Sequence, residues 1–268
     1  MAALSLEVAL QTHNVSINEQ VLTKQYVSWS RDEHLSEWAA LQLVSAATHD
    51  LVPTPLHLEV DPPCVAMSLL PGNPLSGSLT AAELDGLEVA LRELWSVPAD
   101  GLRQLALAPS EGAGHIIARV RESVKSWQGV GMVAEAHAMA LEWLAGPQPE
   151  QFLTPYAEPI VGHGDPNLSN YLWDGSRVRI VDFEDSGRSD PAVELANLVE
   201  HLSARDTDWT EFVSRFPVDP ARLAAARCLW ATFWLTLLRP GGASALRNPA
   251  GTAEKQAGRL ITLLKSGA

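Results

Sequence analysis

The sequence predicts an α+β fold of two unequal lobes, a small N-terminal lobe rich in β-strands and a larger lobe that is mainly helical. Two β-prone runs, 21–26 and 64–70, flank one helical pattern near the N-terminus. Helical patterns dominate the rest of the chain, interrupted by a β-hairpin signal at 171–181. A length of 268 residues with 46% hydrophobic residues is enough for a large core.

Alternation and capping signals predict the N-terminal elements. Residues 21–26 alternate apolar and polar side chains, as a half-buried strand does. The capping-box sequence Ser30-Arg31-Asp32-Glu33 predicts a helix that begins near Ser30. The apolar face of this helix would consist of Leu35, Trp38, Leu41 and Val44. Two prolines end the helical region within 52–55, and the apolar strand 64–70 runs into a Pro71-Gly72 turn.

The remaining helices are predicted from apolar periodicity. Three lie between residues 80 and 146, separated by prolines and glycine-rich turns: 84–95, 116–124 and 132–144. A long apolar helix follows at 223–238, and Pro240-Gly241-Gly242 separates it from a last helix at 253–264. We expect these helices to form the scaffold of the larger lobe.

The stretch Val161–Asp185 carries the most informative motif. It reads Val-Gly-His-Gly-Asp-Pro-Asn-Leu-Ser-Asn, an apolar run, an Asp-Gly turn, a second apolar run and Asp-Phe-Glu-Asp. Because Asp-Gly between two β-prone runs is a strong hairpin signal, the chain should fold back on itself here. Asn170, at the hairpin entrance, then lies within about one residue of direct opposition to Asp182, at its exit. Two hard oxygen donors meet there and can hold Mg²⁺.

Asp165 stands five residues before Asn170. Pro166 keeps this segment from continuing as a helix or a central strand, so we expect Asp165 in a loop beside the metal site. Its carboxylate can accept a hydroxyl proton, and phosphoryl transfer needs little more than one such base and cations that neutralise phosphate oxygens. The alternative is a polar turn followed by an ordinary hairpin, but the spacing and the strand context favour phosphoryl transfer.

At these residues the chain resembles the aminoglycoside phosphotransferase and choline kinase family, a branch of the protein-kinase-like fold. The family pattern is His-x-Asp, four residues, Asn and a hydrophobic strand that ends in Asp. His163, Asp165, Asn170 and Asp182 occupy those places. The resemblance implies that Asp165 is the catalytic base, that Asn170 and Asp182 coordinate Mg²⁺, and that His163 supports the loop by packing and hydrogen bonding.

The match continues at Ser189–Ala196, where the family has Gly-Asp-Pro-x-x-Asp-Leu-Ala. Asp190 would be a structural anchor beneath the catalytic loop, and Asp before Pro is also a good helix N-cap. Only seven residues separate Asp182 from Asp190. Such a short connection cannot be a regulated activation segment, which argues against a polypeptide acceptor.

The resemblance also divides the chain into a nucleotide-clamping lobe, 1–70, and a catalytic and acceptor-binding lobe, 71–268. Lys24, on the first predicted strand, would contact the α and β phosphates of ATP. Glu37, on the following helix, is the candidate to pair with Lys24 and hold it toward phosphate. Solvated side chains are the alternative for both residues.

The resemblance further identifies 64–70 as the hinge between the lobes. The backbone near Ser68 and Leu70 would hydrogen-bond adenine, and Met67 would guard the inner wall, although an ordinary buried strand would look much the same. The chain departs from the pattern at Asn14–Gln20. That stretch contains no glycine where a glycine-rich phosphate loop is expected, although Asn and Ser suit a tight turn.

Composition indicates the kind of partner. A formal net charge of −13 argues against nucleic acid and suits a cationic small molecule, although a solvated acidic surface is the commoner explanation. Carboxylates that could receive aminoglycoside ammonium groups cluster in the predicted acceptor region: Glu194, Glu200, Asp206, Asp208 and Glu211. Trp209, Trp230 and Trp234 could instead face a choline-like cation. The four-residue spacing of Trp230 and Trp234 favours core packing for those two.

No segment predicts a membrane span or an export signal. The longest apolar stretch, Cys228–Leu238, is too short to cross a bilayer, and Met1–Leu10 lacks a basic leader. Two cysteines, one in each predicted lobe, argue against a disulfide framework and favour a cytoplasmic location. The sequence gives no indication of oligomeric state.

These observations predict an ATP- and Mg²⁺-dependent O-phosphotransferase that moves the γ-phosphoryl group to a hydroxyl of a small molecule, first of all an aminoglycoside or aminosugar. Choline-like amines, neutral sugars and homoserine-like alcohols remain open as acceptors. The alternative from another class is a nucleotide-binding pseudokinase that serves as an interaction module. The intact set of Asp165, Asn170 and Asp182 argues against it, and the missing glycine-rich loop favours it.

Overall fold

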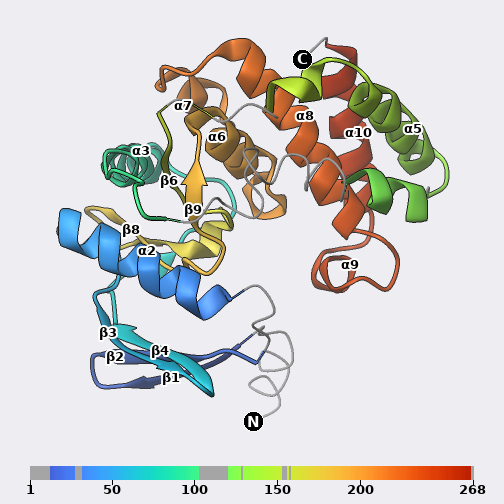
Figure 1. Cartoon of the computed structure of the whole chain (residues 1–268). Coiled ribbons are helices and arrows are strands. Elements are labelled where there is room, and N and C mark those ends of the chain that lie inside the picture. Colours follow the sequence, from blue (N-terminus) through green and yellow to red (C-terminus); the bar gives the residue numbers. More distant parts are fainter. Residues whose placement is uncertain are drawn as a thin grey trace.

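The smaller lobe is built on an antiparallel four-stranded sheet. The computed structural model describes residues 13–27, 32–102, 120–127, 129–152, 156 and 158–266. The sheet consists of β1 (Asn14–Asn18), β2 (Val21–Gln25), β3 (Pro55–Val60) and β4 (Pro63–Ser68), in the order β1-β2-β4-β3. Strand β2 lies between β1 and β4 in this sheet, and its residue Lys24 is buried. Figure 1 shows the sheet at one end of the molecule, below α2.

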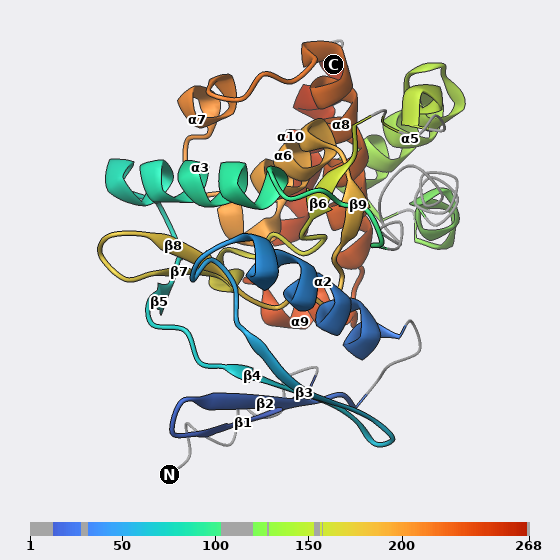
Figure 2. The same ribbon diagram turned by 60° about the vertical axis from the view of Figure 1, so that its left-hand side comes forward.

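Helix α2 (Glu33–Ala47) lies between this sheet and the larger lobe (Figures 1 and 2). It begins after Asp32, which has a left-handed backbone and makes no side-chain cap, while Ser30 and Arg31 lie outside the described residues. The predicted apolar face is only partly correct. Leu41 and Val44 are buried, but Leu35 is 41% exposed, and Glu37 is buried in its stead. A carboxylate can occupy this face because the sheet supplies a cation and a hydroxyl to pair with it.

Two short sheets join the lobes and carry the predicted motif. Strands β5 (Asn73–Pro74), β7 (Tyr171–Trp173) and β8 (Val178–Ile180) form one, and β6 (Ile160–Gly162) pairs with β9 (Gly187–Ser189) in the other. The predicted hairpin is confirmed. Tyr171 pairs with Ile180, and Val181 donates its N–H to the carbonyl of Asn170 at 2.9 Å, so Asn170 lies one residue from opposition to Asp182.

The larger lobe is mainly helical. Its described helices are α3 (Ala81–Trp95), α5 (Met132–Ala145), α6 (Pro191–Glu200), α7 (Thr210–Ser214), α8 (Pro220–Leu237), α9 (Ala243–Arg247) and α10 (Thr252–Lys265). Short 3₁₀ turns lie between these elements, at Gln148–Phe152, Leu168–Asn170 and Leu202–Ala204. Helix α8 is buried on most sides, between α6 and α10 (Figure 1). The helices predicted at 84–95, 132–144, 223–238 and 253–264 are confirmed as α3, α5, α8 and α10. Of the helix predicted at 116–124, residues 116–119 lie outside the described residues and 120–124 are helical. The short helices α7 and α9 were not predicted.

Within the described part of the chain, no helix is long and apolar enough to cross a membrane.

Candidate active site

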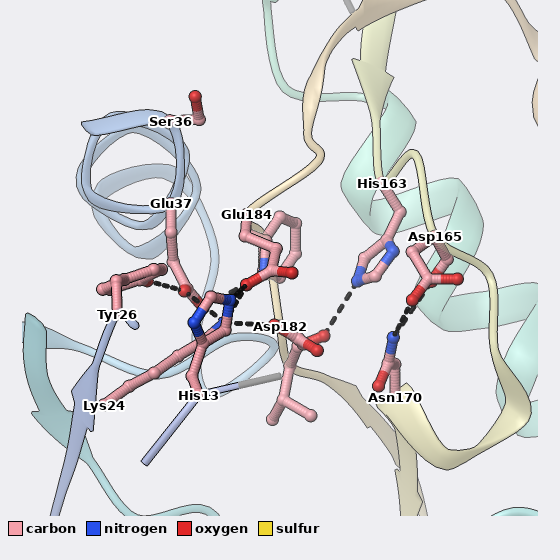
Figure 3. A network of polar contacts seen from close by, with 12 residues as sticks. His13, Lys24, Tyr26, Ser36, Glu37, His163, Asp165, Asn170, Asp182 and Glu184 are labelled. Carbon is pink, nitrogen blue, oxygen red and sulfur yellow. Dashed lines mark hydrogen bonds and ion pairs between the residues drawn. The ribbon is translucent and has the colours of Figure 1, made fainter. Parts of the chain in front are cut away.

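The loop between β6 and β7 holds Asp165 beside Asn170. Gly164, at φ 85°, lets the chain turn after β6. The side chain of Asn167 then caps the 3₁₀ turn Leu168–Asn170. Asn170 donates its Nδ2 to the carbonyl of Asp165 at 3.0 Å and to its carboxylate at 3.4 Å. As Figure 3 shows, these bonds turn the amide oxygen of Asn170 away from Asp165, where it can serve as a ligand.

The loop is held from the side of α6 by Glu194. This buried carboxylate accepts the N–H of His163 at 2.9 Å and the hydroxyl of Ser189 at 2.7 Å. The His163 ring is itself buried, with Nε2 2.8 Å from the carbonyl oxygen of Val181 at the end of β8. The structure thus places His163 between the loop and β8, and its supporting role stays a prediction.

Asp190 supports the loop less directly than the sequence predicts. It caps α6 by accepting the N–H of Val193 at 3.0 Å, and it pairs with Arg222 of α8 at 2.7 Å. It thus fixes the helix that carries Glu194, and Glu194 holds the loop. Sequence reasoning assigned Glu194 to acceptor binding, whereas the structure buries it under the loop, because three loop and strand donors converge on it.

Across the hairpin, Asp182 meets the predicted lysine and glutamate of the smaller lobe. Lys24 pairs with Glu37 at 2.9 Å, with Glu184 at 2.6 Å, and with Asp182 (Figure 3). Burial alone would lower the pKa of Lys24, but the surrounding carboxylates raise it well above its usual value. The lysine is therefore a buried, permanently charged group at the mouth of the hairpin.

Glu37 connects three parts of the molecule. One oxygen accepts from Lys24 and from the hydroxyl of Tyr26, both on or next to β2. The other accepts the N–H of Phe183 at 3.1 Å, directly after Asp182. A single carboxylate therefore ties α2, the sheet and the Asp182 segment together.

Glu184 is a site residue that sequence reasoning missed. Its carboxylate lies with those of Glu37 and Asp182 in a group whose oxygens are within 4.8 Å of one another. His13 Nε2 lies 2.8 Å from it. Burial would raise the pKa of Glu184, but His13 and Lys24 outweigh it and lower that pKa to about 2. Its position two residues after Asp182 was a usable signal, since alternate residues can face one ion.

The oxygen donors fit a hard divalent cation. Carboxylate and amide oxygens are ligands that Mg²⁺ prefers. Asp182 lies in one carboxylate group with Glu184 and Glu37, and it shares the cavity lining with Asn170 at the open end of the hairpin. Lys24 balances part of the negative charge of Asp182 and Glu184.

A cavity of about 290 Å³ opens between the lobes beside this cluster. Its lining includes Leu22, Lys24, Met67, Ser68, Leu70 and Asp182. The structure thus brings the predicted hinge, the predicted lysine and a predicted metal ligand to one cavity. Its walls are mostly apolar and include the charged groups Lys24, Glu37 and Asp182, a composition typical of small-molecule sites.

The hinge backbone has an unusual hydrogen-bond pattern. Ser68 donates its N–H to Thr54 at 2.9 Å, but Thr54 donates its own N–H to the Ser68 hydroxyl at 2.8 Å and not to the Ser68 carbonyl. Leu69 donates to Gln20 at 2.8 Å. The serine hydroxyl thus accepts the Thr54 N–H in place of the Ser68 carbonyl.

The expected phosphate loop at Asn14–Gln20 is not a loop. Residues 14–18 form β1, and only Glu19 and Gln20 turn, with Glu19 at φ 52°. His13, just before β1, is buried against Tyr26 with ring centroids 4.7 Å apart and lies beside Glu184. His13 thus connects the start of β1 to the carboxylate cluster through Glu184.

A second and larger cavity, of about 780 Å³, lies on the other side of Asp165. Asp165, Asp185, His201, Phe233, Trp234 and Arg247 are among the residues that line it. The Asp165 side chain is 35% exposed. Removal from water raises the pKa of Asp165 to about 6, with His163 opposing the shift and the charges of Asp182 and Asp185 adding to it.

The carboxylates expected to receive an acceptor's ammonium groups do not line this cavity. Glu194 lies under the loop, Glu200 pairs with Arg227 and Arg259, and Glu211 pairs with Arg215. Asp206 and Asp208 also lie outside the lining. Of the two that lie on α6, Glu194 points to the loop, and Glu200 points to Arg227 of α8 and Arg259 of α10. Of the three tryptophans, Trp209 and Trp230 are core residues. Trp234 packs against the core and also lines the cavity, so the core expectation is correct for Trp230 and partly correct for Trp234.

The two lobes, the cavity between them and the Asp165–Asn170–Asp182 set define a protein-kinase-like phosphotransferase architecture. The chain belongs to the phosphotransferase enzyme family, whose model matches residues 17–243. The predicted family and the predicted kinase-like fold are therefore confirmed, and the chain is an enzyme of the phosphotransferase class.

Solved structures with the same fold are distant in sequence. A choline/ethanolamine kinase family protein from Mesorhizobium loti is 18% identical, with TM-score 0.69 over 95% of this chain and 85% of that chain. Choline kinase LicA from Streptococcus pneumoniae is 14% identical, with TM-score 0.64 over 95% and 90%. Aminoglycoside 2'-phosphotransferase-IIIa, as its GDP complex, is 16% identical, with TM-score 0.61 over 96% and 90%. No curated protein matches the chain.

Proposed function

We propose that this enzyme transfers the γ-phosphoryl group of ATP to a hydroxyl of a small molecule. One observation carries the proposal: the hydrogen-bonded pair Asp165 and Asn170 joins the two cavities. Asn170 lines the cavity between the lobes, and Asp165 lines the larger one. A nucleotide in the first and an acceptor in the second would meet at this pair, and such positioning is most of what phosphoryl transfer requires.

Asp165 is the base in this proposal. A pKa near 6 leaves its carboxylate ionised at neutral pH while making it more basic than an ordinary aspartate. Asn170 fixes the carboxylate by hydrogen bonding, so Asp165 can orient the acceptor hydroxyl and take its proton as the phosphoryl group leaves ATP.

The residues that would hold Mg²⁺ are Asn170 and Asp182, with Glu184 as a third ligand. Bound Mg²⁺ supplies neutralisation of the β and γ phosphate oxygens. Lys24 would keep Glu37 as its partner and exchange Asp182 and Glu184 for the α and β phosphates, because those two carboxylates are then needed as ligands.

The hinge favours adenine. The Ser68 carbonyl accepts no bond from Thr54, and the Leu70 backbone lies beside it in the same cavity. A carbonyl acceptor next to an N–H donor matches the amino group and ring nitrogen of adenine. We place the lobe boundary at this hinge, so that residues 1–70 clamp the nucleotide and residues 71–268 carry catalysis and acceptor binding. We also propose that the reaction takes place in the cytoplasm. Cys64 and Cys228 form no disulfide, which supports that compartment.

The acceptor cavity suits a hydroxylated small molecule, with aminoglycosides and aminosugars as the class first expected. Its only described lining carboxylates are Asp165 and Asp185, so a strongly polycationic acceptor has less support than the sequence suggests. Phe233 and Trp234 favour a choline-like amine as the second candidate, since aromatic faces attract quaternary ammonium groups.

Magnesium-dependent ADP release across a panel of amino sugars, sugars and amino alcohols tests the proposal. The wild-type enzyme should turn over ATP, faster with an acceptor, and Asp165→Asn should reduce the rate by about 100-fold or more. If wild type releases ADP no faster than Asp165→Asn with every acceptor and with water, the pseudokinase alternative is correct.

A further inference from the structure

His201 lines the acceptor cavity beside the proposed base, Asp165. It ends α6 and caps the 3₁₀ turn Leu202–Ala204, and it is 6% exposed. Its ring meets Trp234 edge-on, with centroids 4.3 Å apart. Two tightly packed elements therefore fix the ring plane, so His201 presents one edge to the cavity.

Hydrogen bonds assign the proton to Nε2 of this ring. Ser203 donates its backbone N–H to His201 Nδ1 at 3.1 Å, and the Ser203 hydroxyl lies 2.7 Å from the same nitrogen. That hydroxyl already accepts the N–H of Leu168 at 2.9 Å, so its own proton is directed to Nδ1. Because Nδ1 accepts, the neutral ring carries its proton on Nε2.

The ring is neutral as well as oriented. Burial, aided by the charge of Arg205, lowers the pKa of His201 to about 3. Its Nε2 lies 3.6 Å from the nearer carboxylate oxygen of Asp165. This distance is too long for a hydrogen bond. The Nε2–H of His201 therefore does not bond to Asp165 and is available to a ligand in the cavity.

We propose that His201 binds the acceptor by donating Nε2–H to an oxygen adjacent to the reactive hydroxyl. Such an oxygen bonds to Nε2 while the neighbouring hydroxyl bonds to Asp165, and the short separation of the two protein atoms matches neighbouring oxygens on one acceptor. The acceptor class is therefore a vicinal diol, as in a sugar or a cyclitol. A choline-like alcohol offers no second oxygen. This inference rests on the proposed function.

Two substitutions separate this role from a structural one. His201→Asn can still cap the 3₁₀ turn, since an Asn oxygen accepts a backbone N–H two residues on, but it cannot reach the cavity. His201→Gln loses the short cap and places an amide N–H near the position of Nε2. If His201 acts only as a cap, His201→Asn should retain more activity than His201→Gln. If His201 binds the acceptor, His201→Gln should retain more activity than His201→Asn.

The measurement is kcat and KM for Mg²⁺-dependent ADP release with D-ribose, 2-deoxy-D-ribose, myo-inositol, D-glucosamine, choline and water as acceptors. We expect a diol to be the best acceptor and its deoxy counterpart to be worse. With that diol, His201→Asn should lose about 10- to 100-fold in kcat/KM at unchanged KM for ATP, and His201→Gln should retain most of it.

Each outcome decides one proposal. If no added compound accelerates the reaction, the same comparison is made on ATP hydrolysis, with water held between Asp165 and His201. The inference is wrong, and the proposed function stands, if His201→Asn matches wild type or if choline is the best acceptor. Absence of any Asp165-dependent turnover overturns the proposed function itself.

Discussion

Tyr26 donates one of the three hydrogen bonds that the Glu37 carboxylate accepts from the described residues. Burial, together with the charge of Glu37, raises the pKa of Tyr26, so its hydroxyl stays protonated and donates to that carboxylate. Tyr26→Phe leaves Lys24 as the partner of one Glu37 oxygen and should reduce the free energy of unfolding by about 1–3 kcal/mol. Urea denaturation measures this. In a double-mutant cycle with Glu37→Gln the effects should be strongly non-additive, and additive effects would show that the hydroxyl contributes nothing through Glu37.

His201 should make stability pH-dependent. Its pKa is about 3 in the folded state and about 6.5 when unfolded, so the unfolded state binds more protons between these values. Stability is therefore lost as pH falls from about 6.5 toward 3, by at most about 1.4 kcal/mol per pH unit. Asp165, with a folded pKa of about 6 against 3.8, contributes the opposite sign over part of this range.

The difference between wild type and His201→Asn isolates the histidine, because Asp165 is common to both. Urea denaturation at pH 7 and pH 4.5 should show a larger loss for wild type than for the variant. Parallel pH profiles would mean that His201 is not buried and neutral in the folded enzyme.

At the residue scale, the sequence predicts best what lies in one motif. Asn170 and Asp182 could be placed from the hairpin, because its turn fixes the register, and Asp165 from the neighbouring Pro166. The Lys24–Glu37 pair, from separate segments, was expected only through the family resemblance. Glu194 and His201 could not be placed from the sequence. Their partners are loop and turn groups whose approach to α6 depends on how that helix packs.

At the element scale, the edge between β3 and β4 can be tested through Ser68. Without the hydroxyl, Thr54 has the Ser68 carbonyl as its nearest acceptor, and that carbonyl would no longer be available to adenine. Ser68→Ala should raise KM for ATP several-fold, on the order of one hydrogen bond, at unchanged kcat.

Ser68→Thr is the matched control for this prediction, because it retains the hydroxyl and should keep KM near wild type. Steady-state kinetics with ATP and GTP measure both variants. If Ser68→Ala and Ser68→Thr have the same KM for ATP, the Ser68 hydroxyl does not control whether the hinge carbonyl is available to adenine.

Element types were predictable, and element faces were less so. Apolar periodicity predicted α3 and α10, which each bury one apolar face, whereas α8 was predicted from a long apolar run and is buried on most sides. The same rule misassigned part of α2. It buries Glu37 while Leu35 is exposed, and nothing local to the helix reveals that β2 brings a cation and a hydroxyl to that face.

At the scale of the whole molecule, the two lobes meet through an unbalanced cluster of charges. Lys24 faces the carboxylates of Glu37, Asp182 and Glu184, with His13 beside the last. Neutral contacts also join the lobes, as in the 2.8 Å bond from Ile180 N–H to the Leu51 carbonyl. Excess negative charge at the junction means that a divalent cation and a nucleotide should stabilise the closed arrangement together.

This arrangement predicts cooperative thermal stabilisation. At about 100 times its Kd, a ligand adds about 2.7 kcal/mol, which at this chain length is on the order of 5–10 °C in Tm. Wild type should gain this with Mg²⁺ and ADP together, less with ADP alone, and should return to its initial Tm after chelation. Asp182→Asn should respond to ADP but lose the additional effect of Mg²⁺, because a carboxylate ligand is gone. Asp85→Asn, the same change on an exposed residue paired with Arg215, should behave as wild type. Differential scanning calorimetry measures all three proteins, and an Mg²⁺ effect that survives in Asp182→Asn would place the cation elsewhere.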